Sequence, residues 1–310
     1  MSASAASQSA GENRPFGIGL MLGAMLTMTA MDTAVKWAVA DYSLQQVNFI
    51  RSIAAMLTLS PLIWHHGGLS ALRTSRPLVH VWRTALMLII SYTWFFALRY
   101  MKLADLAAIV MMSPLMITAL SAPLLGEKVG LRRWIAVGVG FVGMLIIVRP
   151  GFGVFHPVSL LAVMVAFGYA MLILSNRANR ERESLASLTY YPLIGIFVVS
   201  SVLSPFGWTQ PDTIAWSAML FVGVCAGLGH LCLTLAFRFA SPPVLAPLEY
   251  SGLLWAVLFG WLFFGELQDR WAFVGMALIT AAGVFVVYRE AVLSSAPMPE
   301  TPAAKADLPS

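Results

Sequence analysis

"LLGEKVGLRRWIAVGVGFVGMLIIV" occupies residues 124–148, and a looser copy, "FFGELQDRWAFVGMALITAAGVFVV", occupies residues 263–287. In both stretches an apolar segment ends at Gly-Glu, a basic residue and a tryptophan follow, and a second apolar segment with several glycines comes next. The Gly-Glu pairs begin at positions 126 and 265 and the tryptophans lie at positions 134 and 271, so nearly the same length of chain separates the members of each pair. So constant a spacing indicates that the chain consists of two similar halves.

Two further pairs of segments keep nearly the same spacing. "ALRY" at 97–100 matches "AFRF" at 236–239, and "SLQQVNF" at 43–49 matches "SLASLTY" at 184–190. With the spacing of this last pair, Lys36 corresponds to Arg177. We therefore expect the two repeats over residues 16–150 and 151–289, between polar tails at 1–15 and 290–310 that are predicted to be disordered.

The composition is that of a membrane protein. Hydrophobic residues make up 59% of the chain and charged residues only 11%, and the mean hydropathy is +0.80. A soluble domain has about 25% charged residues. The net charge of +5 does not indicate a nucleic-acid partner, because the Lys and Arg side chains lie in short segments between apolar stretches. The expected environment is a lipid bilayer, and a homodimer is compatible with the sequence.

Ten apolar stretches are each long enough to cross a bilayer, which takes about 20 helical residues. The predicted fold class is therefore all-α: a polytopic membrane protein with ten transmembrane helices, arranged as two inverted five-helix repeats. The repeats are inverted because five is odd, so the second half enters the membrane from the opposite side. Inverted repeats are typical of transporters. The predicted spans are residues 16–39, 44–64, 79–99, 103–124, 131–149, 157–176, 187–206, 213–236, 243–264 and 271–288.

The basic residues predict the orientation of the chain. With the N-terminus in the cytoplasm, the inner segments carry most of the Lys and Arg residues between the spans, including those at 132, 133, 177, 180 and 182. The outer segments then carry Arg99, Lys102, Arg149 and Arg270. Because cytoplasmic segments are enriched in Lys and Arg, we expect both termini in the cytoplasm and the protein in the cell inner membrane.

The arrangement of these features resembles a known family. Two halves of five helices, each with Gly-Glu after its fourth helix and a Gly-containing fifth helix, resemble the drug/metabolite transporter (DMT) superfamily, and in particular its EamA-type branch. The resemblance covers about residues 16–289, and 124–148 is its most specific element. It implies transport of a small metabolite. "MDTAVKW" at 31–37 and "LRTSRPLVHVWR" at 72–83 are weakly similar to carriers of riboflavin and S-adenosylmethionine.

Charged residues inside the predicted first and second spans are the main candidates for a site. Asp32 and Lys36 lie one helical turn apart on one face, and Arg51 in the second span lies at a similar depth. Ionisable residues inside a membrane are costly and usually functional. Two interpretations remain open: these charges bind a substrate or an ion, or they form an internal salt bridge that only joins the two helices.

Glu249 in "LAPLEYSGLLW" is the other isolated charge, and it lies in the second half. Prolines at 242, 243 and 247 precede it, and prolines bend helices and free backbone carbonyls. Tyr250 and Trp255 lie within two turns and are candidates to stack on a planar ligand. A carboxylate in apolar surroundings takes up a proton more readily than one in water, so Glu249 and Asp32 are also candidates for proton coupling.

Nothing in the sequence indicates an enzyme, a cofactor or a metal site. "GVGFVG" at 138–143 matches a dinucleotide-binding pattern, but it lies inside an apolar span, where small residues let helices approach closely. The histidines at 65, 66, 80, 156 and 230 are scattered, and His230 is interpreted as a packing residue. A multi-pass membrane enzyme is therefore the weaker alternative.

The sequence thus predicts a secondary transporter that moves a small organic metabolite by alternating access. A riboflavin-like vitamin is the first expectation for the substrate. A carrier or exporter of amino acids or of S-adenosylmethionine with the same fold is the alternative, because the sulfonium of S-adenosylmethionine suits Asp32 and Glu249.

Overall fold

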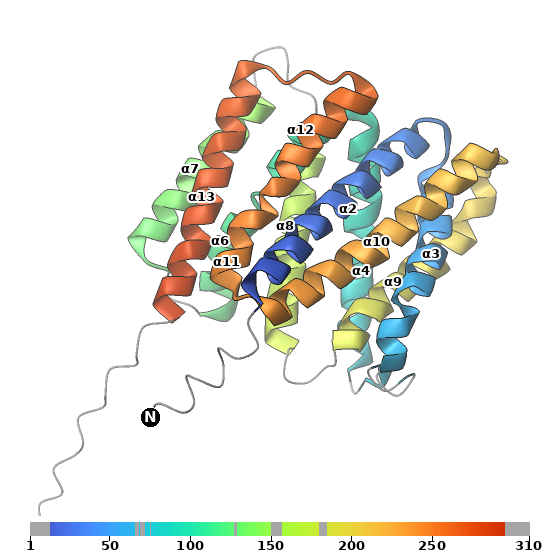
Figure 1. Cartoon of the computed structure of the whole chain (residues 1–310), viewed down its shortest axis with the longest axis horizontal. Coiled ribbons are helices and arrows are strands. Elements are labelled where there is room, and N and C mark those ends of the chain that lie inside the picture. The colour runs from blue at the N-terminus through green and yellow to red at the C-terminus, as the bar shows by residue number, and fades with distance from the viewer. Residues whose placement is uncertain are drawn as a thin grey trace, which may run out of the picture.

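The computed structural model describes residues 13–65, 68, 72–74, 76–126, 129–149, 157–179 and 185–294. Over these residues the chain is helical and has no strands, and its helices pack side by side in one bundle (Figure 1). The prediction of an all-α polytopic membrane protein is confirmed. The helices are α2 (Arg14–Asp41), α3 (Leu44–His65), α4 (Pro77–Tyr100), α5 (Leu103–Val110), α6 (Ser113–Leu125), α7 (Leu131–Val148), α8 (Ser159–Asn179), α9 (Leu185–Leu203), η2 (Ser204–Gly207), α10 (Thr213–Phe239), α11 (Pro242–Glu249), α12 (Ser251–Phe264) and α13 (Arg270–Ser294).

The described helices account for the ten expected spans. Eight helical segments are long and apolar enough to cross a membrane, and Ser159–Ser175 is a shorter apolar helix. The expected second span is α3, whose 22 residues are long enough to cross a membrane. Its polar residues are used inside the bundle, because Gln46 and Asn48 are fully buried and Asn48 accepts a hydrogen bond from Ser91 at 2.8 Å. The tails predicted at 1–15 and 290–310 lie mostly outside the described residues. Their described parts are helical, because α2 begins at Arg14 and α13 continues to Ser294.

The fourth helix of each half is broken, which the sequence analysis did not predict. The span expected at 103–124 divides into α5 and α6 at Met111, and the span expected at 243–264 divides into α11 and α12 at Tyr250. The two breaks are separated by the same length of chain as the two Gly-Glu pairs, so they occupy the same position in the repeat. Pro114 explains the first break, because it lacks the N–H that would bond to the carbonyl four residues earlier. Pro247 lies one turn before the second break.

The two breaks meet between the halves. Gly252, at the start of α12, faces both Met111 and α2: an added Cβ would lie 3.4 Å from the Met111 side chain and 3.6 Å from that of Met25. In addition, the Thr29 hydroxyl donates to the Gly252 carbonyl at 3.4 Å. Irregular backbone at this depth is tolerated where it is buried in protein or lines a cavity.

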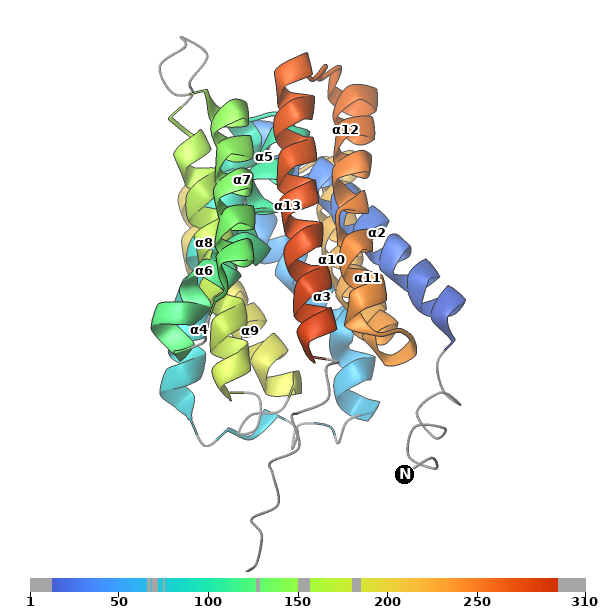
Figure 2. The ribbon, with the colours of Figure 1, turned by 90° about the vertical axis from the view of Figure 1, so that its left-hand side faces the viewer.

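The Gly-rich fifth helices pack against each other, as α7 and α13 do in Figures 1 and 2. A Cβ on Gly143 would lie 2.9 Å from the Gly275 carbonyl oxygen, and a Cβ on Gly275 would lie 2.6 Å from that of Gly143. Gly143 of "GVGFVG" therefore serves close helix packing, whereas Gly138 has nothing within 4 Å of an added Cβ.

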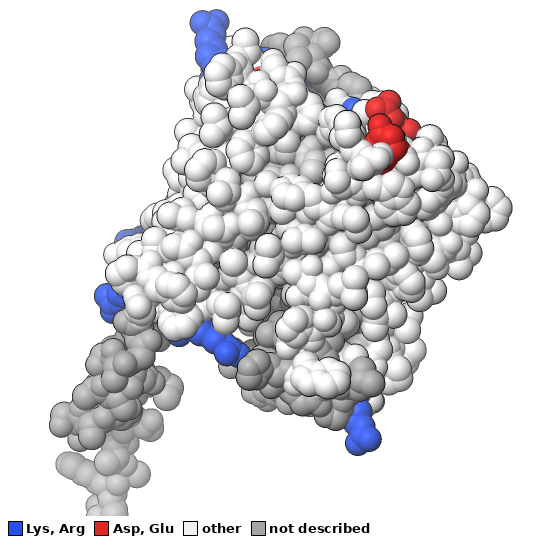
Figure 3. Space-filling view, turned by 45° about the vertical axis from the view of Figure 1, so that its right-hand side comes forward, with Lys and Arg blue, Asp and Glu red and all other residues white. Residues whose placement is uncertain are grey.

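Both ends of the bundle are distinct from its middle. The first turn of α2 and the last turns of α13 lie at the same end (Figures 1 and 2), as an even number of spans requires. On the face shown in Figure 3, charged side chains lie only toward the two ends, and the middle is uncharged. An uncharged belt of this kind is what the hydrocarbon core of a bilayer requires.

Candidate functional site

Asp32 lies in the interior on α2, where its side chain is half-buried. Its carboxylate accepts a hydrogen bond from Trp94 Nε1 of α4 at 2.9 Å. The neighbouring hydroxyls of Thr29 and Thr33 donate to backbone carbonyls of their own helix. In the described part of the chain Asp32 has no ion-pair partner, so its charge is available to a ligand.

Arg51 of α3 lies near Asp32 but is not paired with it. Its guanidinium lies over the ring of Phe95, 5.0 Å from the ring centre. Its Nε is buried and has no hydrogen-bond acceptor among the described residues. Asp32 and Arg51 interact electrostatically, yet no ion pair joins them. The structure therefore gives no support to the alternative that the two residues only lock α2 to α3.

The second half contributes two polar side chains that the sequence analysis did not select. Tyr169 of α8 interacts electrostatically with Asp32 and Arg51, and His230 of α10 interacts with Arg51. Both side chains are exposed although they neighbour groups deep in the bundle. This combination is typical of residues that line an open cavity. Nothing in the sequence around either residue distinguishes it from a packing residue.

Lys36 is placed differently from Asp32, although only one turn separates them. Its ammonium pairs with Glu266 at 2.9 Å and donates to the carbonyls of Leu98, at 2.9 Å, and Met101. It also lies 5.4 Å from the centre of the Phe264 ring. These contacts satisfy the Lys36 charge within the protein and join the end of α2 to the loop between α12 and α13.

Glu266 organises this end of the bundle, which the predicted orientation makes the outer one. Its second oxygen accepts from the Leu103 N–H at 2.8 Å and so caps α5. Two further contacts link the halves here: Lys102 donates to the Leu267 carbonyl at 2.6 Å, and Arg149 pairs with Asp269. The hydrogen bond from Arg149 holds the pKa of Asp269 below its ordinary value. Glu266 is the glutamate of "FFGE"; its counterpart at 127 lies outside the described residues.

Glu249, Tyr250 and Trp255 surround the break between α11 and α12. Tyr250 is 7% exposed, and a Cβ on Gly283 of α13 would collide with its hydroxyl. That hydroxyl and Trp255 Nε1 are buried without a hydrogen-bond partner among the described residues. Glu249 is half-buried. These residues form a second polar group, joined to the Asp32 helix through the contact of Gly252 with Thr29.

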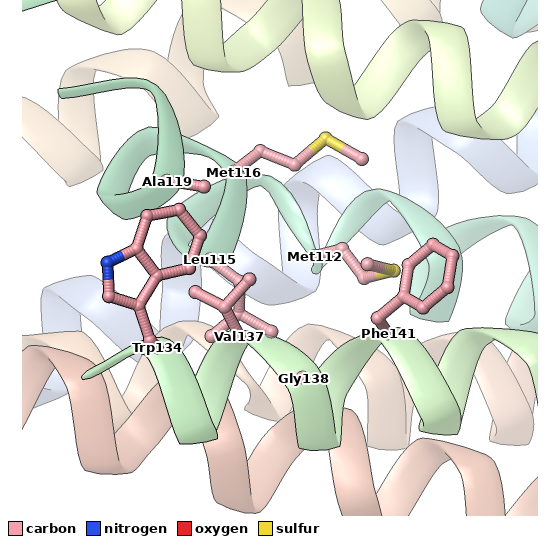
Figure 4. A pocket seen from close by; sticks show the side chains of 8 residues that line it. All are labelled: Met112, Leu115, Met116, Ala119, Trp134, Val137, Gly138 and Phe141. Carbon is pink, nitrogen blue, oxygen red and sulfur yellow. The ribbon is translucent and has the colours of Figure 1, made fainter. Parts of the chain in front are cut away.

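A separate groove of about 340 Å³ lies between α6 and α7 (Figure 4). Its lining is apolar, with Met112, Leu115 and Met116 on one side and Trp134 and Phe141 on the other. None of the predicted site residues lines it. No cluster of His, Cys, Asp or Glu among the described residues is suited to hold a metal ion.

Comparison with known proteins decides the family. The model of the EamA-like transporter family matches the chain twice, over residues 15–149 and 156–289. The chain belongs to the EamA-like transporter family. The resemblance stated from the sequence is confirmed, and an EamA-like transporter is not an enzyme. It crosses the membrane several times, as its helices require.

Similar proteins span nearly the whole of this EamA-like transporter. An S-adenosylmethionine uptake transporter of Rickettsia felis is 27% identical over 88% of this chain and 93% of its own. A riboflavin transporter of Vibrio cholerae is 28% identical over 87% of this chain and 92% of its own. A solved crystal structure superposes with a TM-score of 0.61 at 17% identity, covering 92% of this chain and 100% of that one, and supports the fold alone.

Proposed function

We propose that this EamA-like transporter is a secondary carrier of a small organic metabolite in a bacterial inner membrane, with both termini in the cytoplasm. The observation that carries the proposal is that Asp32 and Arg51 have no ion-pair partner among the described residues and lie inside a bundle whose two broken helices meet. In transporters built from inverted repeats, substrates bind near broken helices at the repeat interface. An internal charge without a partner in such a place is best explained by a ligand.

The contacts of Glu266 support alternating access with the outer side closed. Glu266 belongs to the second half, and its two partners, Lys36 and the Leu103 N–H, belong to the first. Together with the hydrogen bond from Lys102 to the Leu267 carbonyl, these bonds hold the outer ends of the halves together. Substrate leaving outward would have to separate them.

On the inner side, one helix pair of the described chain is packed less closely than its counterpart on the outer side. By the repeat, α2 and α4 of the first half correspond to α8 and α10 of the second. Helix α2 packs on α4 through the contacts of Asp32, Lys36 and Arg99, whereas α8 and α10 are not packed neighbours over the described residues. Tyr169 lies on α8 and His230 on α10, and both side chains are exposed. A cavity between α8 and α10 that opens to the inner side would explain this exposure.

Two substrate candidates follow from the sequence and from the relatives. The accessible aromatic rings of Trp94 and Tyr169 suit a planar ring system, which both riboflavin and S-adenosylmethionine contain. The relatives named for each of these compounds support both candidates. A riboflavin-like vitamin remains the first expectation from the sequence, and the charges at the site favour the alternative.

Reconstitution tests the proposal. The full chain in liposomes loaded with unlabelled S-adenosylmethionine or riboflavin should take up the labelled form of one of them by counterflow. Asp32→Asn should lower that uptake at least tenfold, whereas Asp41→Asn, at the end of the same helix, should not change it. If no candidate metabolite crosses the membrane, or if Asp32→Asn transports as wild type does, the proposed function of this site is wrong.

A further inference from the structure

The two central charges of the site have opposite signs and remain apart. Asp32 has its bond from Trp94 and no cation, and Arg51 has its contact with the Phe95 ring and no anion, within the described chain. Ionised groups in a low-dielectric interior are normally paired or hydrogen-bonded. Because Asp32 and Arg51 form no ion pair with each other among the described residues, a ligand can offer a partner to each of them.

We infer that Asp32 and Arg51 together bind the zwitterionic head group of an α-amino acid, with its ammonium on Asp32 and its carboxylate on Arg51. The inference rests on the proposed function and names the substrate class of that site. A ligand with both charges satisfies both residues at once. A simple cation would leave Arg51 unpaired, and a simple anion would be repelled by Asp32.

The details of each side fit its assigned partner. A guanidinium presents N–H donors in a planar fork that matches a carboxylate. The Phe95 ring supports the flat side of the Arg51 guanidinium, which leaves the N–H edges to point at a ligand. On the other side, Trp94 donates to one oxygen of Asp32 and leaves the second oxygen to accept from the ligand ammonium.

The second half completes the site from the opposite wall. Tyr169 and His230 are exposed beside Arg51, so they can donate hydrogen bonds to the ligand carboxylate or to the group that follows it. The head group would then contact helices of both repeats. A ligand that bridges the repeats can respond to their relative movement, as alternating access requires.

The site discriminates against neutral ligands for the same reason. A neutral planar molecule could stack on Trp94 or Tyr169, but it would displace water from Asp32 and Arg51 without replacing its charge interactions. Buried charges left without partners reduce affinity strongly. An aromatic ring joined to an amino-acid head group satisfies the rings and the charges together.

Three probes separate these possibilities in equilibrium binding to the purified full chain: S-adenosylmethionine, its decarboxylated analogue, and riboflavin. The wild type should bind S-adenosylmethionine at least tenfold more tightly than the analogue without the carboxylate. Arg51→Gln should abolish that preference, because it lowers the affinity for S-adenosylmethionine and not for the decarboxylated analogue. Asp32→Asn should lower the affinity for both compounds, because both carry the ammonium group. Arg99→Gln, which removes an arginine at the outer end of α4, should leave all affinities unchanged.

The outcome that overturns the inference is distinct from failure of the proposed function. If the wild type binds S-adenosylmethionine and its decarboxylated analogue with equal affinity, Arg51 does not bind the ligand carboxylate and the inference is wrong. Tight binding and counterflow of riboflavin, with no binding of either amine, also overturns the inference while the protein remains a transporter. Arg51→Lys serves as the folding control: it keeps the charge without the fork, and it should retain part of the preference for the carboxylate.

Discussion

Replacing Glu266 by glutamine tests whether the outer contacts hold the carrier closed on that side. The substitution keeps the size of the side chain and one acceptor oxygen but removes its charge. Glutamine can still accept from the Leu103 N–H, whereas the ion pair with Lys36 at 2.9 Å is lost. The main effect is therefore on the contact between α2 and the loop after α12.

The magnitude follows from the burial and the partners of this pair. A hydrogen bond between charged groups contributes about 1.5–3 kcal/mol. The two side chains are 12% and 13% exposed, so solvent screens them little. Lys36 keeps its bonds to the carbonyls of Leu98 and Met101, which places the loss near the middle of that range. A loss of about 2 kcal/mol shifts an equilibrium about thirtyfold, toward the state in which the outer ends separate.

Spin labels measure this shift directly. Labels at Asp41, at the outer end of α2, and at Leu267, in the loop after α12, report the separation of the halves in a variant without Cys225 and Cys232. Glu266→Gln should increase the population with the longer distance. Asp269→Asn is the matched control, because that side chain is 51% exposed and such pairs contribute little. An unchanged distance distribution in Glu266→Gln would refute the assignment of Glu266 to outer closure.

The remaining predictions concern helix packing, topology and proton coupling. Gly143→Ala should destabilise the protein by about 1–3 kcal/mol through overpacking, because the added methyl group meets the Gly275 carbonyl. Gly138→Ala is the control and should not destabilise the protein, because an added Cβ there has nothing within 4 Å. Thermal unfolding in detergent compares the two variants. A reporter fused after residue 290 should be cytoplasmic and one inserted near residue 153 periplasmic, and the opposite result would reverse the orientation. Glu249→Gln should leave substrate binding intact but make exchange in liposomes insensitive to a pH gradient; pH-dependent uptake equal to wild type would assign Glu249 a structural role.

The charges of the first span show where prediction from sequence succeeded and where it could not. Asp32, Lys36 and Arg51 could be identified as candidates because they lie inside apolar segments, where a charge is costly and is usually kept for a function. Their spacing placed Asp32 and Lys36 on one helix face but could not assign their partners. Lys36 pairs with Glu266, which belongs to the other half of the chain, so it is not available to a ligand as Asp32 and Arg51 are. No pattern in the sequence near Lys36 predicts this ion pair.

Tyr169 and His230 are candidate site residues that could not be predicted from the sequence. Aromatic and histidine side chains in membrane helices usually pack, and nothing near either residue in the chain indicates otherwise. They become candidates only because the bundle brings α8 and α10 beside Arg51 and leaves both side chains exposed.

The sequence by itself determined the membrane location, the helical class and the two halves, because these depend on hydropathy and on repetition along the chain. Backbone groups in a bilayer must bond within their own helix, so a sufficiently long apolar stretch is enough to predict a span. Tertiary structure alone decided which charges form ion pairs among the described residues, and where the two breaks at Met111 and Tyr250 meet. Those outcomes depend on distances between helices, and a linear sequence carries no direct measure of such distances.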